Sequence, residues 1–190
     1  TVPQKCFLSG EYKERYLHDM NIAVKYADVS RKYMGQTLIS KLGLSIEEDF
    51  TTVHNYIDTV CGILRKGAVS AQKDETLIIP INMRDGSLLC RGKGNHEWNF
   101  TAPHGAGRLM KRADAKASIT LEEYREAMKG IYSTSVSEST IDESPMAYRS
   151  IDDITDTVEP TVEITDVITP VYNFKASKAE IDEETADGED

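Results

Sequence analysis

The chain lacks any apolar run that approaches the roughly 18 residues of a membrane span. It also has few cysteines. Cys6, Cys61 and Cys90 are scattered, odd in number and without CxxC spacing. This usage argues against a disulfide framework and against a zinc site made from this chain alone. We therefore expect a cytoplasmic protein with no membrane partner.

What is present describes an ordinary globular protein. The 190 residues are 39% hydrophobic and 28% charged, which is sufficient for one domain with a sizeable core. Taken alone, the net charge of -10 counts against a nucleic-acid partner, but the distribution of charge along the chain matters more.

Acidic and basic residues are concentrated in different segments. Residues 176–190 carry seven acidic residues against one lysine, and residues 138–166 carry nine against one arginine. Residues 61–116 instead carry ten basic residues against five acidic ones. A local positive field of this kind attracts phosphate groups whatever the total charge. An ordinary mixed surface is the alternative, because the local excess is modest.

The apolar pattern predicts an α+β fold, with a mixed sheet or sandwich-like core flanked by helices. Helices are expected over residues 11–42, 45–50, 109–117, 120–130 and 151–158. The first should end at Ser40–Gly43 and pack its tyrosines into a core, while Ser45 with Glu48 should cap the second.

Strands are expected over residues 54–64, 76–79, 87–91, 161–168 and 171–174, with a Ser/Thr-rich loop over 133–140. Pro80 should end its strand and place the following residues in a loop, where binding chemistry is common. Residues 176–190 form an acidic tail, whose composition predicts disorder.

The segment from Ala102 to Arg108 is the strongest candidate for chemistry. Glycines on either side of Ala106 let the backbone approach an anion, and Arg108 adds a fixed cation. The imidazole of His104 can be neutral near pH 7, so it can attack phosphorus or bind a metal. A helix beginning at Leu109 would place its N-terminus beside His104. For this motif alone, a glycine turn with a surface histidine is the better explanation.

Several further motifs follow one another in a defined order along the chain. Together they resemble the RtcB family of RNA-splicing ligases over about residues 11–175, and the chain looks like the C-terminal half of a short, divergent branch. The motifs are Tyr16-Leu17-His18-Asp19-Met20, His54-Asn55, Arg65-Lys66-Gly67-Ala68, Pro80–Ser87, His104–Arg108, Ala147-Tyr148 and Lys175. On this reading residues 1–175 are the C-terminal part of the catalytic domain, and residues 176–190 are the tail.

The resemblance implies a GTP- and manganese-dependent ligase. Such an enzyme joins RNA 2′,3′-cyclic phosphate or 3′-phosphate ends to 5′-hydroxyl ends through a histidine–GMP intermediate. It implies His104 as the nucleophile, Arg108 as the charge stabiliser and His54 as a manganese ligand. The family also suggests an archease-type activator, and the N-terminal half of the ligase as a partner. Positions matching the family's GTP-binding residues are His54, Asn55, Pro80, Ile81, Asn82, Met83, Ser87, His104, Gly105, Ala106, Gly107, Tyr148 and Lys175.

The match has departures and gaps. The commoner family loop reads Pro-Gly-Ser-Met-Gly, so Ile81, Asn82 and Arg84 differ from it. The family's aspartate–cysteine metal pair, its Asn-His segment and a further metal histidine have no counterpart here. A two-metal site therefore cannot be completed from this chain.

Two other functions stay open. The chain could be a catalytically silent remnant that binds GTP or RNA without the metals, which the upstream sequence would decide. It could also be a structural domain whose acidic tail binds a basic partner, which deletion of residues 176–190 would test.

Overall fold

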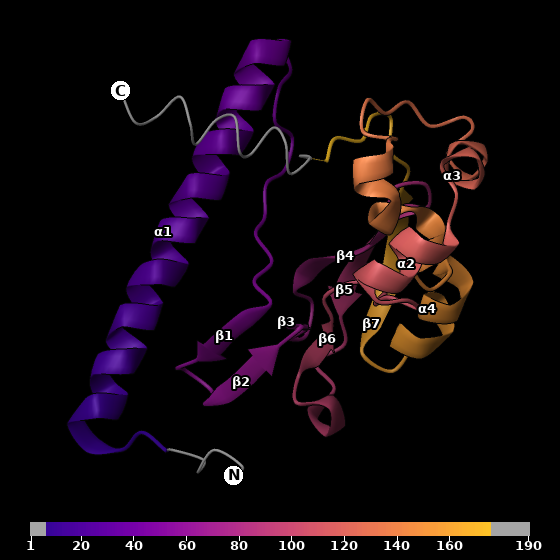
Figure 1. Ribbon diagram of the computed structural model, residues 1–190. Helices are drawn as coiled ribbons and strands as arrows, with labels where there is room; N and C mark the ends of the chain where they lie inside the picture. The colour runs from indigo at the N-terminus through magenta and orange to yellow at the C-terminus, as the bar shows by residue number, and fades with distance from the viewer. Residues whose placement is uncertain (1–6, 176–190) are drawn as a thin grey trace, which may run out of the picture. The chain divides into compact units, whose positions relative to one another are not determined.

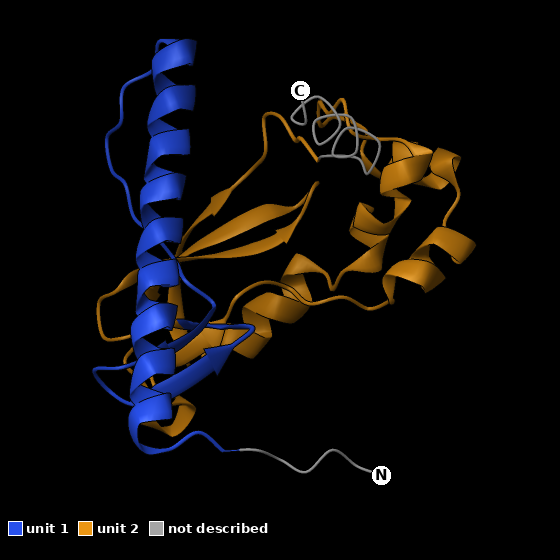
Figure 2. Cartoon of the chain, turned by 60° about the vertical axis from the view of Figure 1, so that its left-hand side comes forward, with its two compact units in different colours: residues 1–69 blue, residues 70–190 orange. Residues whose placement is uncertain are grey.

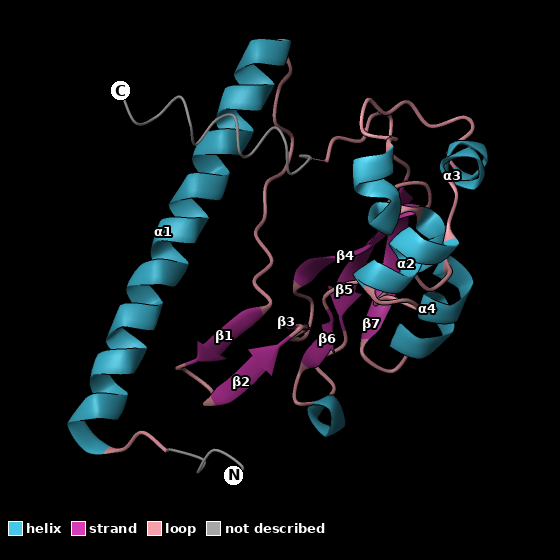
Figure 3. Cartoon of the chain, in the orientation of Figure 1, coloured by secondary structure: helices cyan, strands magenta, loops and turns pink. Residues whose placement is uncertain are grey.

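The computed structural model describes residues 7–175 and divides the chain into two compact units, residues 1–69 and 70–190 (Figure 2). The described residues form helices and antiparallel sheets, which confirms the α+β class (Figure 3). The expected tail at 176–190 lies outside the described residues.

The first unit is dominated by one long helix, α1 (Gly10–Leu42), drawn in indigo and violet in Figure 1. It ends as predicted, because Gly43 adopts the left-handed conformation and its N–H caps the carbonyls of Ile39 and Ser40. The prediction that its tyrosines enter a core is wrong for the described chain. No residue of α1 is buried among the described residues, and Tyr12 and Tyr26 are largely exposed.

The short helix expected over residues 45–50 is not formed, and these residues are irregular. A capping pattern at Ser45 and Glu48 is insufficient here. Six residues add too few hydrogen bonds to recover the cost of helix nucleation.

The single strand expected over residues 54–64 is instead a hairpin of β1 (Asn55–Asp58) and β2 (Ile63–Lys66). Asp58 makes the turn, since its carboxylate accepts from the N–H groups of Val60 and Cys61 at 3.0 and 3.3 Å. Arg65 also donates to this carboxylate at 3.0 Å. Hydrogen bonds from Cys61 and Arg65 lower the pKa of Asp58 to about 2, against the effect of burial.

The main sheet of the second unit has the strand order β4-β5-β7. Its strands are β4 (Thr76–Asn82), β5 (Gly86–Gly92) and β7 (Val162–Ile168), and the central β5 pairs antiparallel with each of the other two. Leu77, Ile79 and Ile81 alternate as buried residues along β4, the period of a strand with one apolar face. Two further short strands are β3 (Ala68–Ser70), at the boundary of the two units, and β6 (Thr101–Pro103), which η1 (His96–Trp98) precedes.

Pro80 does not end its strand, which corrects the sequence prediction. It lies within β4 opposite Ser87, and the register shifts between Pro80 and Asn82. β4 is at the edge of its sheet, where a proline removes no ladder hydrogen bond on the open side.

A second layer of the same unit consists of short helices. They are α2 (Arg112–Ser118), α3 (Leu121–Ala127), η2 (Glu138–Glu143), η3 (Pro145–Ala147) and α4 (Ile151–Val158). Capping boxes begin α3 at Thr120 and α4 at Ser150, at the starts of two helices that the sequence predicts. Met83, directly after β4, packs in one apolar cluster with residues in or beside α2, α3, η2 and η3. The cluster consists of Met83, Ala115, Ile119, Tyr124, Met128, Ile141 and Ala147.

Three other expectations are corrected in this layer. α2 begins at Arg112, so no helix starts directly after the glycines, because the N–H groups of Leu109 and Met110 bond the Ala147 carbonyl instead. The expected loop at 133–140 passes into η2. Residues 171–174, which follow Pro170, form no strand. Their one β-bridge is an isolated one between Asn173 and Ser133.

Candidate functional site

His104 lies directly after β6, in the second unit, and is exposed. The N–H of Ala106 donates to the Pro80 carbonyl at 3.0 Å. A Cβ added at Gly105 would lie 3.1 Å from the same carbonyl oxygen, so the glycine permits this approach. The histidine turn is therefore held against β4, and two motifs far apart in the sequence become neighbours.

The Pro80–Ser87 segment alternates between buried and more exposed residues. Ile81 and Met83 are buried, and the Met83 sulfur accepts from the Tyr124 hydroxyl at 3.1 Å. The side-chain Oδ1 of Asn82 accepts from the backbone N–H groups of Arg84 and Asp85 at 2.9 and 2.8 Å, which closes a turn. Nucleotide contacts at Pro80, Ile81, Asn82, Met83 and Ser87 stay a prediction.

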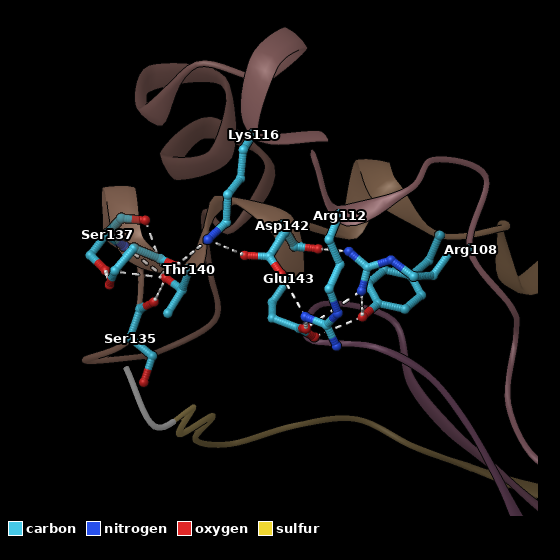
Figure 4. A network of polar contacts seen from close by, with 10 residues as sticks. Arg108, Arg112, Lys116, Ser135, Ser137, Thr140, Asp142 and Glu143 are labelled. Carbon is cyan, nitrogen blue, oxygen red and sulfur yellow. Dashed lines mark hydrogen bonds and ion pairs between the residues drawn. The ribbon is translucent and has the colours of Figure 1, made fainter. Parts of the chain in front are cut away.

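Arg108 is the centre of a polar network, shown in Figure 4. Its Nη1 donates to the Tyr148 hydroxyl at 2.7 Å and to Glu143 Oε1 at 3.4 Å, while Nη2 donates to the Asp142 carbonyl. The guanidinium also lies over the Tyr148 ring, 4.6 Å from its centroid. Of the residues singled out from the sequence, Arg108 and Tyr148 are thus brought together directly.

Glu143 connects most of the network, although the sequence did not single it out. Its carboxylate accepts from Tyr148 at 2.7 Å and from Arg112 at 2.6 Å, and lies 3.9 Å from the Lys175 ammonium. Lys175, predicted from the sequence to contact nucleotide, therefore joins Arg108 and Tyr148 at this carboxylate. No spacing in the sequence distinguishes Glu143 from the other acidic residues of 138–166.

Burial and charge perturb the ionisable groups of this network. Burial opposes the ionisation of Glu143, but hydrogen bonds from Tyr148 and Arg112 and the nearby Lys175 lower its pKa. Burial and the hydrogen bond to Glu143 raise the pKa of Tyr148 to about 12. At neutral pH the carboxylate is therefore ionised and the phenol keeps its proton.

The network has more positive than negative charge. Asp142 is paired with Arg112 at 2.5 Å and with Lys116 at 3.3 Å. Four cationic side chains, Arg108, Arg112, Lys116 and Lys175, thus face two carboxylates, Asp142 and Glu143. An excess of fixed cations suits an anionic ligand such as a phosphate.

His54 and Asn55 lie in the first unit, at the start of the hairpin. Asn55 Oδ1 accepts from the Gly67 N–H at 2.9 Å, and the His54 carbonyl accepts from the Ala68 N–H at 3.4 Å. The structure therefore joins the His54-Asn55 motif to the Arg65–Ala68 motif. The side chain of Asn55 is engaged in shaping this turn.

The described residues do not fit a complete metal centre. Within 7–175, no group of three or more His, Cys, Asp or Glu side chains is arranged to hold an ion. His54 supplies one imidazole, which suits several transition metals and selects none of them.

An exposed histidine in a glycine-rich turn, with a net cationic network in the same unit, suits the binding of phosphate groups. Comparison with known proteins is more specific, because the family model of the tRNA-splicing ligase RtcB matches residues 6–176. The chain therefore belongs to the RtcB family.

Individual relatives agree with this assignment. RNA-splicing ligase RtcB of Escherichia coli K12, and RtcB1 of the Escherichia coli strain ATCC 25922, are each 31% identical over 176 residues. These matches cover 83% of this chain and 43% of each relative. The tRNA-splicing ligase RtcB of Aeropyrum pernix is 40% identical over 83 residues, which are 41% of this chain and 17% of the relative. The chain thus spans less than half the length of the Escherichia coli proteins.

None of the helices in the described part of the chain combines the length and the apolar character that a membrane crossing requires.

Proposed function

We propose that this chain carries the nucleophile and part of the nucleotide site of an RNA ligase that consumes GTP. The observation that carries the proposal is the exposed His104 turn, which the Ala106–Pro80 hydrogen bond fixes against β4. Membership of the RtcB family and the name "RNA-splicing ligase" of two relatives support the reaction class.

The reaction would proceed in three steps, of which the first two transfer the guanylyl group, to His104 and then to the RNA. A neutral imidazole nitrogen attacks the α-phosphorus of GTP, and the bond to the leaving pyrophosphate breaks, which gives histidine–GMP. An RNA 3′-phosphate oxygen then attacks the same phosphorus and releases the imidazole. Finally, the RNA 5′-hydroxyl attacks the 3′-phosphate, loses its proton and displaces GMP. A 2′,3′-cyclic phosphate end must first be hydrolysed, with water attacking the phosphorus and the 2′-oxygen leaving as a hydroxyl, to give the 3′-phosphate.

The chain's own residues would bind and stabilise charge in these steps. Arg108 supplies a cation for the developing phosphate charge, and Tyr148 and Lys175 are proposed to contact the guanine base. The backbone of Pro80–Asn82 and Gly105–Gly107, with Ser87 and Asn55, would complete the nucleotide contacts. GTP is therefore the proposed nucleotide.

Manganese is the proposed metal, with His54 as one ligand. The described residues do not complete its coordination, so further ligands would have to come from the part of the ligase that this chain does not match. RNA with broken ends and that part of the ligase are the proposed partners, along with an archease-type activator. Cytoplasmic location is proposed with them.

A nucleotide- or RNA-binding chain without catalysis is the second candidate. It is favoured by one observation: the donors of Arg108 are engaged by Tyr148, Glu143, Asp142 and Met110. On this alternative, GTP would bind but His104 would not be modified.

Labelling with radioactive GTP separates the two candidates. The chain is fused to the part of the Escherichia coli ligase outside the match and incubated with manganese and either α- or γ-labelled GTP. The proposal predicts stable transfer of the α-label only, lost in His104→Ala and retained in His96→Ala. Equal labelling of the His104→Ala variant, or GTP binding without any transfer, would contradict it.

A further inference from the structure

We propose that Glu143 is a positioning residue, which holds the Arg108 guanidinium and the Tyr148 phenol in place for the reaction at His104. This inference rests on the proposed function, because it assigns Glu143 a role in the same site. It concerns a side chain that neither the sequence motifs nor the relatives' names point to.

Glu143 reaches both side chains at once. Oε1 accepts from Arg108 at 3.4 Å and Oε2 accepts from the Tyr148 hydroxyl at 2.7 Å. Arg108 also donates to that hydroxyl at 2.7 Å. The three groups therefore form a closed triangle, so moving the carboxylate changes the partners of both other members.

The backbone ladder between Arg108 and Tyr148 does not by itself determine the orientation of their side chains. The Leu109 N–H donates to the Ala147 carbonyl at 2.8 Å, and the Arg149 N–H donates to the Gly107 carbonyl at 3.2 Å. This ladder fixes the Cα positions of Arg108 and Tyr148, which form an isolated antiparallel bridge. It leaves the rotatable bonds of a long arginine side chain free. The carbonyls of Met110 and Asp142 hold two of the guanidinium nitrogens, and the Tyr148 hydroxyl and the Glu143 carboxylate together hold the third, Nη1.

Glu143 itself is well anchored. It ends η2, where Ile141 belongs to the apolar cluster and the Thr140 hydroxyl bonds the Ser135 carbonyl. Only 16% of its side chain is exposed, and Arg112 donates to Oε1 at 2.6 Å (Figure 4). A fixed acceptor of this kind can hold a mobile donor in one orientation.

The benefit to catalysis is organisation before the reaction. Five N–H donors make a guanidinium effective toward phosphate only when its plane is correctly oriented. Restricting that plane beforehand removes an entropic cost from the transfer step, and small misplacements of such groups reduce rates strongly. Glu143 would act through Arg108 and Tyr148 without touching the nucleotide.

The neighbouring carboxylate offers a matched comparison. Asp142 carries the same charge but pairs with Arg112 and Lys116, and only its main-chain carbonyl contacts Arg108. Asp142→Asn therefore removes one charge from the network and leaves the side-chain contacts of Arg108 and Tyr148. Glu143→Gln removes a charge and weakens both contacts.

The first test needs no nucleotide. The arginine side-chain N–H signals of the full chain are recorded by ¹⁵N NMR, with Arg108 assigned through Arg108→Lys. Glu143→Gln should speed hydrogen exchange at Arg108 by at least about tenfold, while Asp142→Asn and the exposed Glu126→Gln should change it far less. Unchanged exchange in Glu143→Gln would overturn the proposal, whether or not the chain transfers guanylyl groups.

The second test measures the rate of His104 labelling at saturating GTP in the fused ligase described above. Glu143→Gln should lower this rate about ten- to a hundredfold with little change in the apparent KM. Adding Glu143→Gln to Arg108→Lys should lower it no further. Independent, multiplicative losses would overturn the positioning role. Absence of labelling in the unmodified protein would instead refute the proposed function, and the NMR test would still decide the role of Glu143.

Discussion

The Tyr148 hydroxyl carries a proton that its surroundings hold unusually tightly. Burial and the hydrogen bond to Glu143 raise its pKa from 10.0 to about 12. The neutral phenol donates to the carboxylate, whereas a phenolate would face a second negative charge at 2.7 Å. Folding therefore favours the protonated form, and the network retains this donor at neutral pH.

This shift predicts a specific loss of stability in alkali. A pKa raised on folding contributes stability that is complete below pH 10 and is lost as the pH rises toward about 12. The free energy of unfolding in urea should fall over this interval by about 1 to 2 kcal/mol more in the native chain than in Tyr148→Phe. Identical pH profiles of the two proteins would show that the phenol titrates normally.

A single buried side chain also links the sheet to the helical layer. Met83 follows β4, is 2% exposed and packs with residues of α2 and α3 in the apolar cluster. Met83→Ala should lower the free energy of unfolding by about 2 to 5 kcal/mol, because it leaves a cavity. Met34→Ala, at a side chain 53% exposed on α1, should change it by less than about 0.5 kcal/mol. Chemical denaturation measures both, and equal effects would contradict the packing described for Met83.

At the scale of elements, the turn between β4 and β5 depends on Gly86. Its φ is +82°, and an added Cβ would lie 1.9 Å from the Ile168 carbonyl oxygen of β7. The strand β7 could not keep its register against β5 with a side chain at this position. Gly130 has a similar positive φ of +88°, but a Cβ added there would lie in open space, with no atom within 4 Å apart from its chain neighbours.

The two glycines therefore make a matched pair. Gly130→Ala should cost only the left-handed penalty of about 1 to 2 kcal/mol. Gly86→Ala should cost clearly more, since the clash with Ile168 adds to the same penalty. Thermal unfolding of both variants measures the difference. Equal losses would mean that β7 moves away at no cost.

Elements defined by local chemistry were predictable from the sequence, and the contacts between them were not. Gly43 ends α1 and Thr120 and Ser150 begin α3 and α4, because caps depend on residues a few positions apart. The prediction that Pro80 ends its strand is wrong, because a proline is tolerated within a strand at the edge of a sheet. No local sequence pattern shows that β4 lies at such an edge.

At the scale of the whole molecule, the same distinction applies to the site. Motif order identified the RtcB family, which the family match over residues 6–176 confirms. It also singled out Arg108, Tyr148 and Lys175, which the structure gathers around one carboxylate. Glu143 could not be found in this way. It lies 35 residues from Arg108 in the sequence, and only the fold brings the two side chains to a contact of 3.4 Å.

The proposal implies that different parts of the ligase supply the nucleophile and the metal ligands. The chain matches 43% of each Escherichia coli relative, and its described residues include the exposed His104 and fixed cations but no group of three or more His, Cys, Asp or Glu that could hold a metal. On our proposal, the nucleotide site is shared between this chain and the remaining part of the enzyme. His104 would then be modified only when the metal ligands of that part are supplied.

The most direct measurement is the intact mass of the fused ligase after incubation with GTP and manganese, beside His104→Ala. The account predicts a gain of one guanylyl group, stable to alkali, labile to acid and absent from the variant. Adding RNA with a 3′-phosphate end should remove the gain, and RNA with a 3′-hydroxyl end should leave it. A gain that persists in His104→Ala, or none in the unmodified protein, would contradict the central claim.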